Sequence, residues 1–410
     1  MFEINRNLEH FQQEIKRKFP KISQNTYDNK PVSLEKIKTA LDEETLLIEY
    51  GYHRESGYIL TIGKEQQTIF TTDFSDVITN IKRLNVLIQS DFSFQKKIQD
   101  EFIEVSHELY KTLIQPIEAE LKGKTKLMIV QEGILFNLPF ELLLSSNEQK
   151  KYTELDFLIK RYKINYHYSA TAYLELQARP KMNDYSFLGF APIFNKNAKI
   201  AEATRSLDFG KDSLYLGFQN NYFTSLPNTK IEVNTISKML RSKGETKTLI
   251  GKKATKSNLS NALKSKHYQF IHIATHGIVN FKNPKLSSIA CYASKKKKES
   301  LFYASEIQNT NIQADLVILS SCESGIGQLV EGEGMIALNR SFFYAGARNV
   351  LFSLWKIDDK KSSELMIDFY KNYLKSHSYT DALHVAKLNL LSNPATAEPK
   401  YWAAFVLMGE

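Results

Sequence analysis

Two residues of the chain, Cys322 and His276, have the side chains that nucleophilic catalysis at a thiol requires. Each follows a short apolar run of the kind that forms a buried strand, at 316–319 and at 270–273. A cysteine in that position lies on a loop, where its side chain faces a cleft while the strand keeps its backbone rigid. The sequence therefore points to thiol chemistry at a strand end.

A catalytic thiol needs a base, because at a reference pKa of roughly 8.5 only a few per cent is thiolate at neutral pH. If the two strands are parallel neighbours, about 4.8 Å apart, His276 and Cys322 emerge at the same carboxyl edge of one sheet. The segment between them is long enough for a right-handed crossover. A buried free cysteine and a core histidine are the alternative. We favour catalysis because glycine-bearing loops follow both His276 and Cys322. His272 lies inside its strand, so we expect it to be structural.

The composition is that of a globular protein of two or three domains. The chain has 410 residues, of which 42% are hydrophobic and 24% charged. No apolar run approaches the roughly 20 residues that span a bilayer, and the N-terminus lacks a signal-peptide pattern, so we expect a cytoplasmic protein without a membrane contact. Cys291 and Cys322 make no disulfide framework, and no metal or other cofactor is expected.

The charge and the glycines suggest other ligands, which we do not favour. The net charge is +9, but the lysines are dispersed and no nucleic-acid-binding motif accompanies them, so nucleic acid is not directly expected as a partner. The lysine run at 295–298 is interpreted as a solvated loop. The glycines at 325, 327, 332 and 334 form neither a Walker A loop nor a dinucleotide fingerprint.

The first third of the chain predicts helices and a β-meander. Apolar spacing predicts helices at 4–19 and 33–42, antiparallel strands at 44–50, 57–62 and 67–71, and mostly helix over 75–121 with a break at Pro116. Nothing in these segments has a catalytic pattern. No repeat of about 34 residues occurs, so the helix at 4–19 is interpreted as docked on the body or as the remnant of a helical array.

From Lys126 onward strands and helices alternate, which predicts an α/β fold with a mostly parallel sheet covered on both faces. Strands are expected at 127–130, 163–168, 186–190, 246–250, 268–275, 288–293, 316–320, 349–354 and 402–407. Helices are expected at 140–144, 170–177, 230–243, 255–264, 334–345, 359–375 and 379–391. Residues 192–226 are expected to be irregular, with a boundary near Ser225.

Three polar or aromatic signals near the predicted site have structural explanations. The pair Thr229 and Glu232 has the spacing of a capping box for a helix that begins at 230. Asp358 is placed to cap the helix after it. Trp355, at a strand end, either packs against that helix or lines a pocket.

The chain resembles the CHAT domain family, a group of caspase-like cysteine peptidases related to separase. The motifs that carry the resemblance are ATHG at 274–277, LSSCESG at 319–325, EGEGMIALNRSFFYAGARNVLFSLWKIDD at 331–359 and YWAAFVLMGE at 401–410. Upstream, LMIVQEGILFNLPFELLL at 127–144, LPNTKIEV at 226–233 and GKKATKSNL at 251–259 also match the family's pattern. The caspase signature QACRG is replaced by SSCES, so an aspartate preference is not carried over.

The resemblance implies a caspase-like three-layer α/β/α fold in two halves. Its N-terminal helical segment would be 1–43, its pseudo-protease half 44–225 with the helices at 75–121, and its active protease half 226–410. No Cys–His pair recurs in the first half.

The resemblance also implies roles for individual residues. His276 would be the general base and Cys322 the nucleophile, with the backbone N–H groups of Gly277 and Cys322 as an oxyanion hole. The substrate pocket would be built by Trp355, Asp358 and Asp359, together with Glu323. An acid that faces this pocket would favour a basic residue at P1.

The expected function is a cysteine endopeptidase that cuts a specific protein substrate, and the resemblance implies a bacterial signalling or defence setting. An activating partner is expected as well, either an upstream tetratricopeptide sensor or a separate subunit. Two alternatives stay open: a catalytically silent CHAT-like scaffold that binds a peptide, and a ligand-sensing α/β domain that holds a phosphate in its glycine-rich loops.

Overall fold

The structure of the 410-residue chain is a computed structural model. It describes residues 32–90, 96–194, 218–219, 222–223, 225–280, 283–293, 300–320, 328–330, 334–336 and 338–410. For residues 218, 219 and 222, and for 328–330 and 334–336, only the backbone is described. The predicted helix at 4–19 lies outside the described residues.

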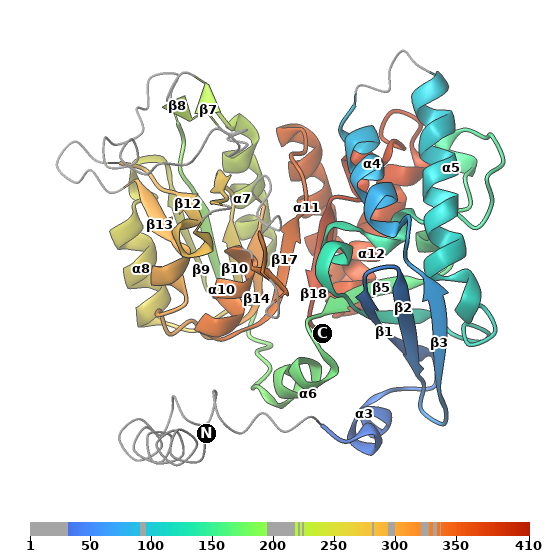
Figure 1. The fold of residues 1–410 in the computed structure, drawn as a ribbon. Helices are drawn as coiled ribbons and strands as arrows, with labels where there is room; N and C mark the ends of the chain where they lie inside the picture. The colour runs from blue at the N-terminus through green and yellow to red at the C-terminus, as the bar shows by residue number, and fades with distance from the viewer. Residues whose placement is uncertain are drawn as a thin grey trace, which may run out of the picture.

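One large sheet of eleven strands organises the described chain (Figure 1). In spatial order it contains β3 (Gln67–Asp73), β2 (Ser56–Ile62), β1 (Thr45–His53), β4 (Lys126–Val130), β5 (Lys163–His167), β18 (Phe405–Met408), β17 (Ala347–Ser353), β14 (Ala314–Leu319), β10 (Tyr268–Ile273), β6 (Phe187–Ala191) and β9 (Thr246–Ile250). The strands β1, β2 and β3 form the predicted antiparallel meander. Most other neighbours are parallel, which confirms the α/β class.

The C-terminal strand β18 joins the two parts of the sheet. It pairs in parallel with β5 on one side and antiparallel with β17 on the other. The strand β6 lies between β10 and β9, although it precedes Ser225 in sequence. One apolar core extends through both parts, from Ile48 on β1 to Leu407 on β18.

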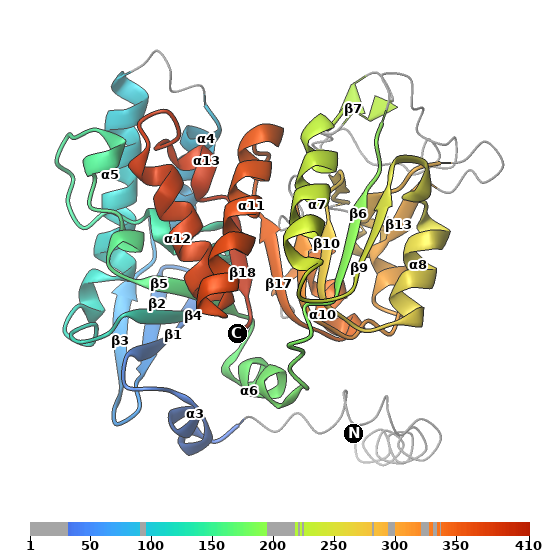
Figure 2. The ribbon, with the colours of Figure 1, turned by 180° about the vertical axis from the view of Figure 1, so that it is seen from behind.

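Helices cover both faces of the sheet, as near-continuous apolar strands require. They are α3 (Leu34–Ala40), α4 (Val77–Gln89), α5 (Lys96–Leu113), α6 (Ala170–Ala178), α7 (Pro227–Leu240), α8 (Lys256–Ser265), α9 (Ala304–Ile307), α10 (Leu338–Ala345), α11 (Asp359–Ser376), α12 (Tyr379–Ser392) and α13 (Pro399–Trp402). In Figure 2 α7 and α11 lie in front of the strands, and Figure 1 shows α10 on the opposite face. None of the helices that the structure describes is both long and apolar enough to cross a membrane.

The helix predicted at 140–144 is wrong. Two short 3₁₀ turns occupy this region, η3 (Gly133–Asn137) and η4 (Phe140–Leu142). Tertiary bonds hold the end of this segment out of a helix, because the Leu158 N–H donates to the Leu143 carbonyl at 2.8 Å and Leu144 forms an antiparallel bridge with Phe157.

Two strand predictions near the site need correction. The strand expected at 288–293 is the short β12 (Ser288–Ala290), and it belongs to a separate three-stranded sheet with β11 (Gly277–Ile278) and β13 (Leu301–Tyr303). The last strand begins at Phe405, because Trp402 ends helix α13. The segment 334–345 also differs, since β16 (Gly334–Ile336) pairs with β15 (Gln328–Val330) before α10 begins.

Candidate functional site

The strands that precede His276 and Cys322 are parallel neighbours, which confirms the predicted arrangement. In their register Ile273 lies opposite Leu319, and the Ser320 N–H donates to the Ile273 carbonyl at 3.0 Å. Both strands therefore end at the same level of one sheet edge. His276 is three residues past Ile273, and Cys322 is three residues past Leu319 in the sequence. Cys322 itself lies outside the described residues.

The imidazole of His276 is enclosed by two aromatic rings. His276 is 3% exposed, and its ring centroid lies 5.4 Å from that of Phe223 and 5.5 Å from that of Phe194. The Phe223 ring is stacked, at an interplanar angle of 17°. Phe223 belongs to β8 (Tyr222–Phe223), which pairs with β7 (Phe218–Gln219). Sequence reasoning missed both phenylalanines, because no periodicity marks them within 192–226.

The backbone on both sides of His276 is fixed by β12. The Ala290 N–H donates to the His276 carbonyl at 2.9 Å, and the Thr275 hydroxyl donates to the Ala290 carbonyl at 2.8 Å. Gly277 lies opposite Ile289 in the same antiparallel ladder. Because bonded and non-bonded pairs alternate in such a ladder, the N–H of Gly277 points away from β12. It is directed out of the small sheet.

A small pocket lies beside these strand ends. It encloses about 20 Å³, room for about one water molecule. Its lining is rich in hydroxyl and carboxyl groups, and comprises Leu226, Thr229, Glu232, Thr275, Ser320, Ser353, Ile357, Asp359, Ser362 and Phe405. Thr275 immediately precedes His276, and Ser320 stands two residues before Cys322. The pocket is thus adjacent to the predicted catalytic pair along the chain.

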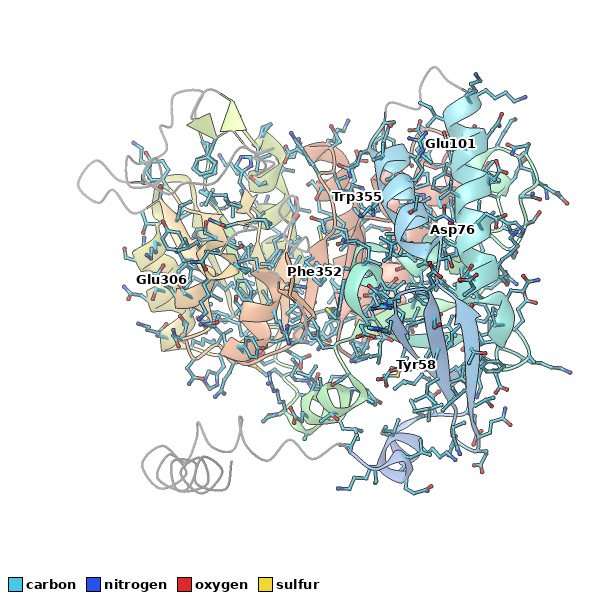
Figure 3. The ribbon with its side chains drawn as sticks, viewed as in Figure 1. Tyr58, Asp76, Glu101, Glu306, Phe352 and Trp355 are labelled. Carbon is cyan, nitrogen blue, oxygen red and sulfur yellow. The ribbon has the colours of Figure 1, made fainter. Side chains whose placement is uncertain are left out.

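The predicted pocket residues occupy different places. Trp355 is 1% exposed, lies inside the molecule (Figure 3) and donates from Nε1 to the Lys400 carbonyl at 3.2 Å. Asp358 caps α11, as predicted, by accepting from the Lys360 and Lys361 N–H groups. Asp359 lines the pocket, and Glu323 lies outside the described residues.

The carboxylate of Asp359 also connects two helices. Its Oδ2 accepts from the backbone N–H of Asn228 at 2.8 Å and from the Asn228 side-chain amide at 2.7 Å. Asn228 lies in the first turn of α7, whereas Asp359 is the first residue of α11. A carboxylate at a helix N-terminus is favourable because it satisfies unpaired N–H groups there. Asp359 therefore fixes the pocket wall.

The capping box predicted at Thr229 and Glu232 is wrong. Helix α7 begins at Pro227, since proline favours the first helical turn, and the Thr229 hydroxyl donates back to the Leu226 carbonyl at 2.8 Å. Glu232 then faces the sheet, where its Oε1 lies 2.6 Å from Nε2 of His272. His272 is fully buried inside β10, which agrees with its predicted structural role.

Cys291 is the free cysteine within the described residues, and it is fully buried. Burial raises the pKa of its thiol, because a thiolate is poorly solvated in an apolar surrounding. Cys291 therefore has the properties of an unreactive core thiol.

Comparisons with known proteins give one family. The sequence model of the CHAT domain matches residues 104–410. Human tetratricopeptide repeat protein 28 is 25% identical over 345 residues, which cover 73% of this chain and 13% of that protein. Its Mus musculus counterpart is 32% identical over 112 residues, which cover 27% of this chain and 4% of that protein. The chain thus spans a small part of these curated relatives.

Among solved structures, the chain is similar in fold to the Saccharomyces cerevisiae separase–securin complex. The TM-score is 0.51 at 10% identity, and the match covers 91% of this chain and 31% of the separase chain. At that identity the similarity shows the caspase-like fold alone.

Proposed function

The chain belongs to the CHAT domain family, and from this premise we propose that it is a cysteine endopeptidase with Cys322 as nucleophile and His276 as general base. The observation that carries the proposal is the register of β10 with β14. It pairs Ile273 with Leu319, from which the two residues are equally distant along the chain. Equal spacing past paired strand ends favours a meeting of the two side chains.

In the proposed mechanism His276 takes the proton of the Cys322 thiol, and the sulfur attacks the scissile carbonyl carbon. The N–H groups of Gly277 and Cys322 donate to the oxyanion that forms. The C–N bond then breaks while His276 returns its proton to the leaving amine, and water hydrolyses the thioester with His276 again as base. The outward direction of the Gly277 N–H supports its role.

We propose that Asp359 contributes to the P1 pocket, whereas the burial of Trp355 and the capping role of Asp358 give those residues supporting roles. A carboxylate at the pocket favours a basic P1 side chain. The pocket as described has room for about one water molecule, so a bound substrate must widen it. Glu323, next to the nucleophile in sequence, is retained as a further pocket residue.

The resemblance to separase and to tetratricopeptide proteins supports a regulated protease with a protein substrate and a sensor or activating subunit. We place it in a cytoplasmic, bacterial signalling or defence setting, and we propose the two halves 44–225 and 226–410 with β6 completing the second. The second candidate is a peptide-binding scaffold. It is favoured by the relatives, which are large tetratricopeptide proteins matched over a small share of their length.

A cleavage-site survey tests the proposal. Wild type and Cys322→Ala are incubated with lysate, and new N-termini are labelled and sequenced. We expect discrete products from wild type that are absent with Cys322→Ala, with Lys or Arg enriched at P1. Products that persist in Cys322→Ala would assign the activity to another residue.

Thiol labelling separates an enzyme awaiting an activator from a scaffold. Iodoacetamide is expected to label Cys322 much faster than Cys291, because Cys291 is buried and its pKa is raised. His276→Ala is expected to slow labelling of Cys322 about tenfold or more at neutral pH, since the thiol loses its proton acceptor and less of it is present as thiolate. His267→Ala is a matched control, as His267 is an exposed histidine just before β10. Equal labelling rates in wild type and His276→Ala would favour the scaffold.

A further inference from the structure

One edge of the large sheet is open. The edge strand β3 pairs on one side with β2 over its whole length, from Gln67 opposite Ile62 to Asp73 opposite Ser56. No strand in the described part of the chain pairs with its other side (Figure 1). Exposure alternates along β3, and Gln67, Ile69, Thr71 and Asp73 are the exposed residues.

The hydrogen bonds at both ends of this hairpin show which backbone groups face outward. The Phe74 N–H donates to the Glu55 carbonyl at 2.8 Å, and the Gly63 N–H donates to the Gln66 carbonyl at 2.9 Å. Because bonded pairs alternate along an antiparallel ladder, residues 68, 70 and 72 bond to β2. The N–H and C=O groups of residues 67, 69, 71 and 73 therefore point away from the sheet.

This edge lacks the usual protection against pairing. Natural sheet edges carry lysine, proline or a bulge. The sequence QTIFTTD of β3 has neither residue, and its register with β2 runs without a bulge. At the opposite edge, β9 carries the exposed Lys247. On β3, Ile69 is 67% exposed, and Tyr58 on β2, labelled in Figure 3, is 45% exposed on the same face.

We propose that β3 is a dimer interface, at which β3 of a second copy of this chain adds in antiparallel orientation. The two-fold axis passes between the two Phe70 residues. Ile69 then pairs with Thr71 of the second copy, and Gln67 pairs with Asp73 of the second copy. The two large sheets become one continuous sheet.

This register follows from the strand itself. It is the pairing in which all four outward-facing residues exchange hydrogen bonds, since a shift by two residues leaves one unpaired in each copy. No like charges meet, because the acid Asp73 lies opposite the neutral Gln67. The two Ile69 side chains become diagonal neighbours about 7–8 Å apart, within contact reach. A strand that is complementary to itself meets the requirement of a two-fold interface.

The test is sedimentation of the full chain over a range of concentrations. Wild type is expected to be a concentration-dependent dimer. Ile69→Lys is expected to weaken it at least about tenfold in Kd, because two lysines then become diagonal neighbours. Val86→Lys is the matched control, as Val86 is 57% exposed on α4, away from β3, and this variant is expected to dimerise as wild type.

Two further variants test the register. Thr71→Pro removes an outward N–H without removing a bond to β2, so it is expected to abolish the dimer while urea unfolding of the monomer stays near that of wild type. An equimolar mixture of Ile69→Lys and Ile69→Glu is expected to dimerise more tightly than either variant does alone. A wild type that stays monomeric, or a dimer that survives both Ile69→Lys and Thr71→Pro, would overturn the proposal. Thiol activation at Cys322 plays no part in these outcomes.

Discussion

At the scale of the residue, the aromatic enclosure of His276 is the feature most closely linked to its proposed chemistry. A general base acts well when its ring is held in one orientation. Phe223 stacks on the imidazole, and the tilted ring of Phe194 has its centroid 5.5 Å from that of the imidazole. Neither ring carries a titratable group, so we propose both as residues that position the imidazole.

Replacement of the stacked Phe223 ring is therefore expected to let the His276 imidazole adopt more than one orientation. Phe223→Leu should slow alkylation of Cys322 at neutral pH several-fold, whereas Phe223→Tyr, which keeps a ring, should stay near wild type. The measurement is the rate of iodoacetamide labelling as a function of pH. The same rate and pH profile in both variants would show that stacking has no influence on the base.

A second residue-scale prediction concerns acid stability. His167, at the end of β5, is 2% exposed, and neither ring nitrogen has a hydrogen-bond partner within the described residues. Burial lowers the pKa of His167 to about 3, from an ordinary value of 6.5. The protonated unfolded state is therefore favoured as the pH falls below about 6.5, while the folded state stays neutral down to about 3.

The free energy of unfolding should fall by about 1.4 kcal/mol per pH unit through this group, or roughly 2 kcal/mol between pH 6.5 and 5. His167→Phe keeps a ring against Tyr173 but has no group that titrates. In this variant the fall in the free energy of unfolding that is due to His167 should be absent. Urea unfolding of both proteins at pH 7.5 and pH 5 provides the comparison. An equal loss in the two would mean that His167 does not titrate in this window.

At the scale of the element, the N-termini of α7 and α11 meet at the pocket. Asp358 caps α11, and Asp359 holds Asn228 at the start of α7. The two neighbouring acids thus form different contacts. Asp358 bonds within its own helix, whereas Asp359 connects α11 to α7.

Loss of the Asp358 cap should have a modest effect on the free energy of unfolding. Asp358→Ala is expected to lower the free energy of unfolding by about 1 kcal/mol, because two N–H groups of α11 lose their acceptor. Asp358→Ser, which restores an accepting oxygen, should recover most of it. Urea unfolding gives both values, and a loss of the same size in Asp358→Ser would point to a charge effect instead of a cap.

At the scale of the whole molecule, a buried ion pair connects helix α12 to the 3₁₀ turn η4, far away in the sequence. Lys387 and Glu141 are 1% and 3% exposed, and the Lys387 ammonium lies 2.5 Å from Oε1 of Glu141. The Tyr166 hydroxyl on β5 donates to the same carboxylate. Three segments far apart in the sequence therefore meet at one acid.

Removal of the cation should destabilise the whole domain. Lys387→Met leaves Glu141 buried without its partner, a loss of about 3–5 kcal/mol. We expect one cooperative transition at lower urea, because one apolar core runs through both halves. A separate early transition would show that the first half unfolds by itself. The exposed Lys371→Met on α11 is a matched control.

The sequence by itself determined the features that depend on local patterns. Apolar runs that end at polar residues and glycine located β10 and β14, and with them the edge that carries His276. Asp358 was found as a cap because capping depends on a residue and the next three N–H groups. The meander and the alternation of strands and helices had the same local origin.

Only the tertiary structure decided which distant groups meet. Glu232 faces His272 because it lies on the same buried face of α7 as Val233 and Ile236, and because Pro227 begins the helix too early for Glu232 to close a capping box. The turn at Phe140 does not continue as a helix because Leu143 and Leu144 pair with Leu158 and Phe157. Phe194 and Phe223 surround His276, and β18 joins β5 to β17, through contacts that no periodicity encodes. Burial and long-range hydrogen bonds outweigh local propensity at these positions.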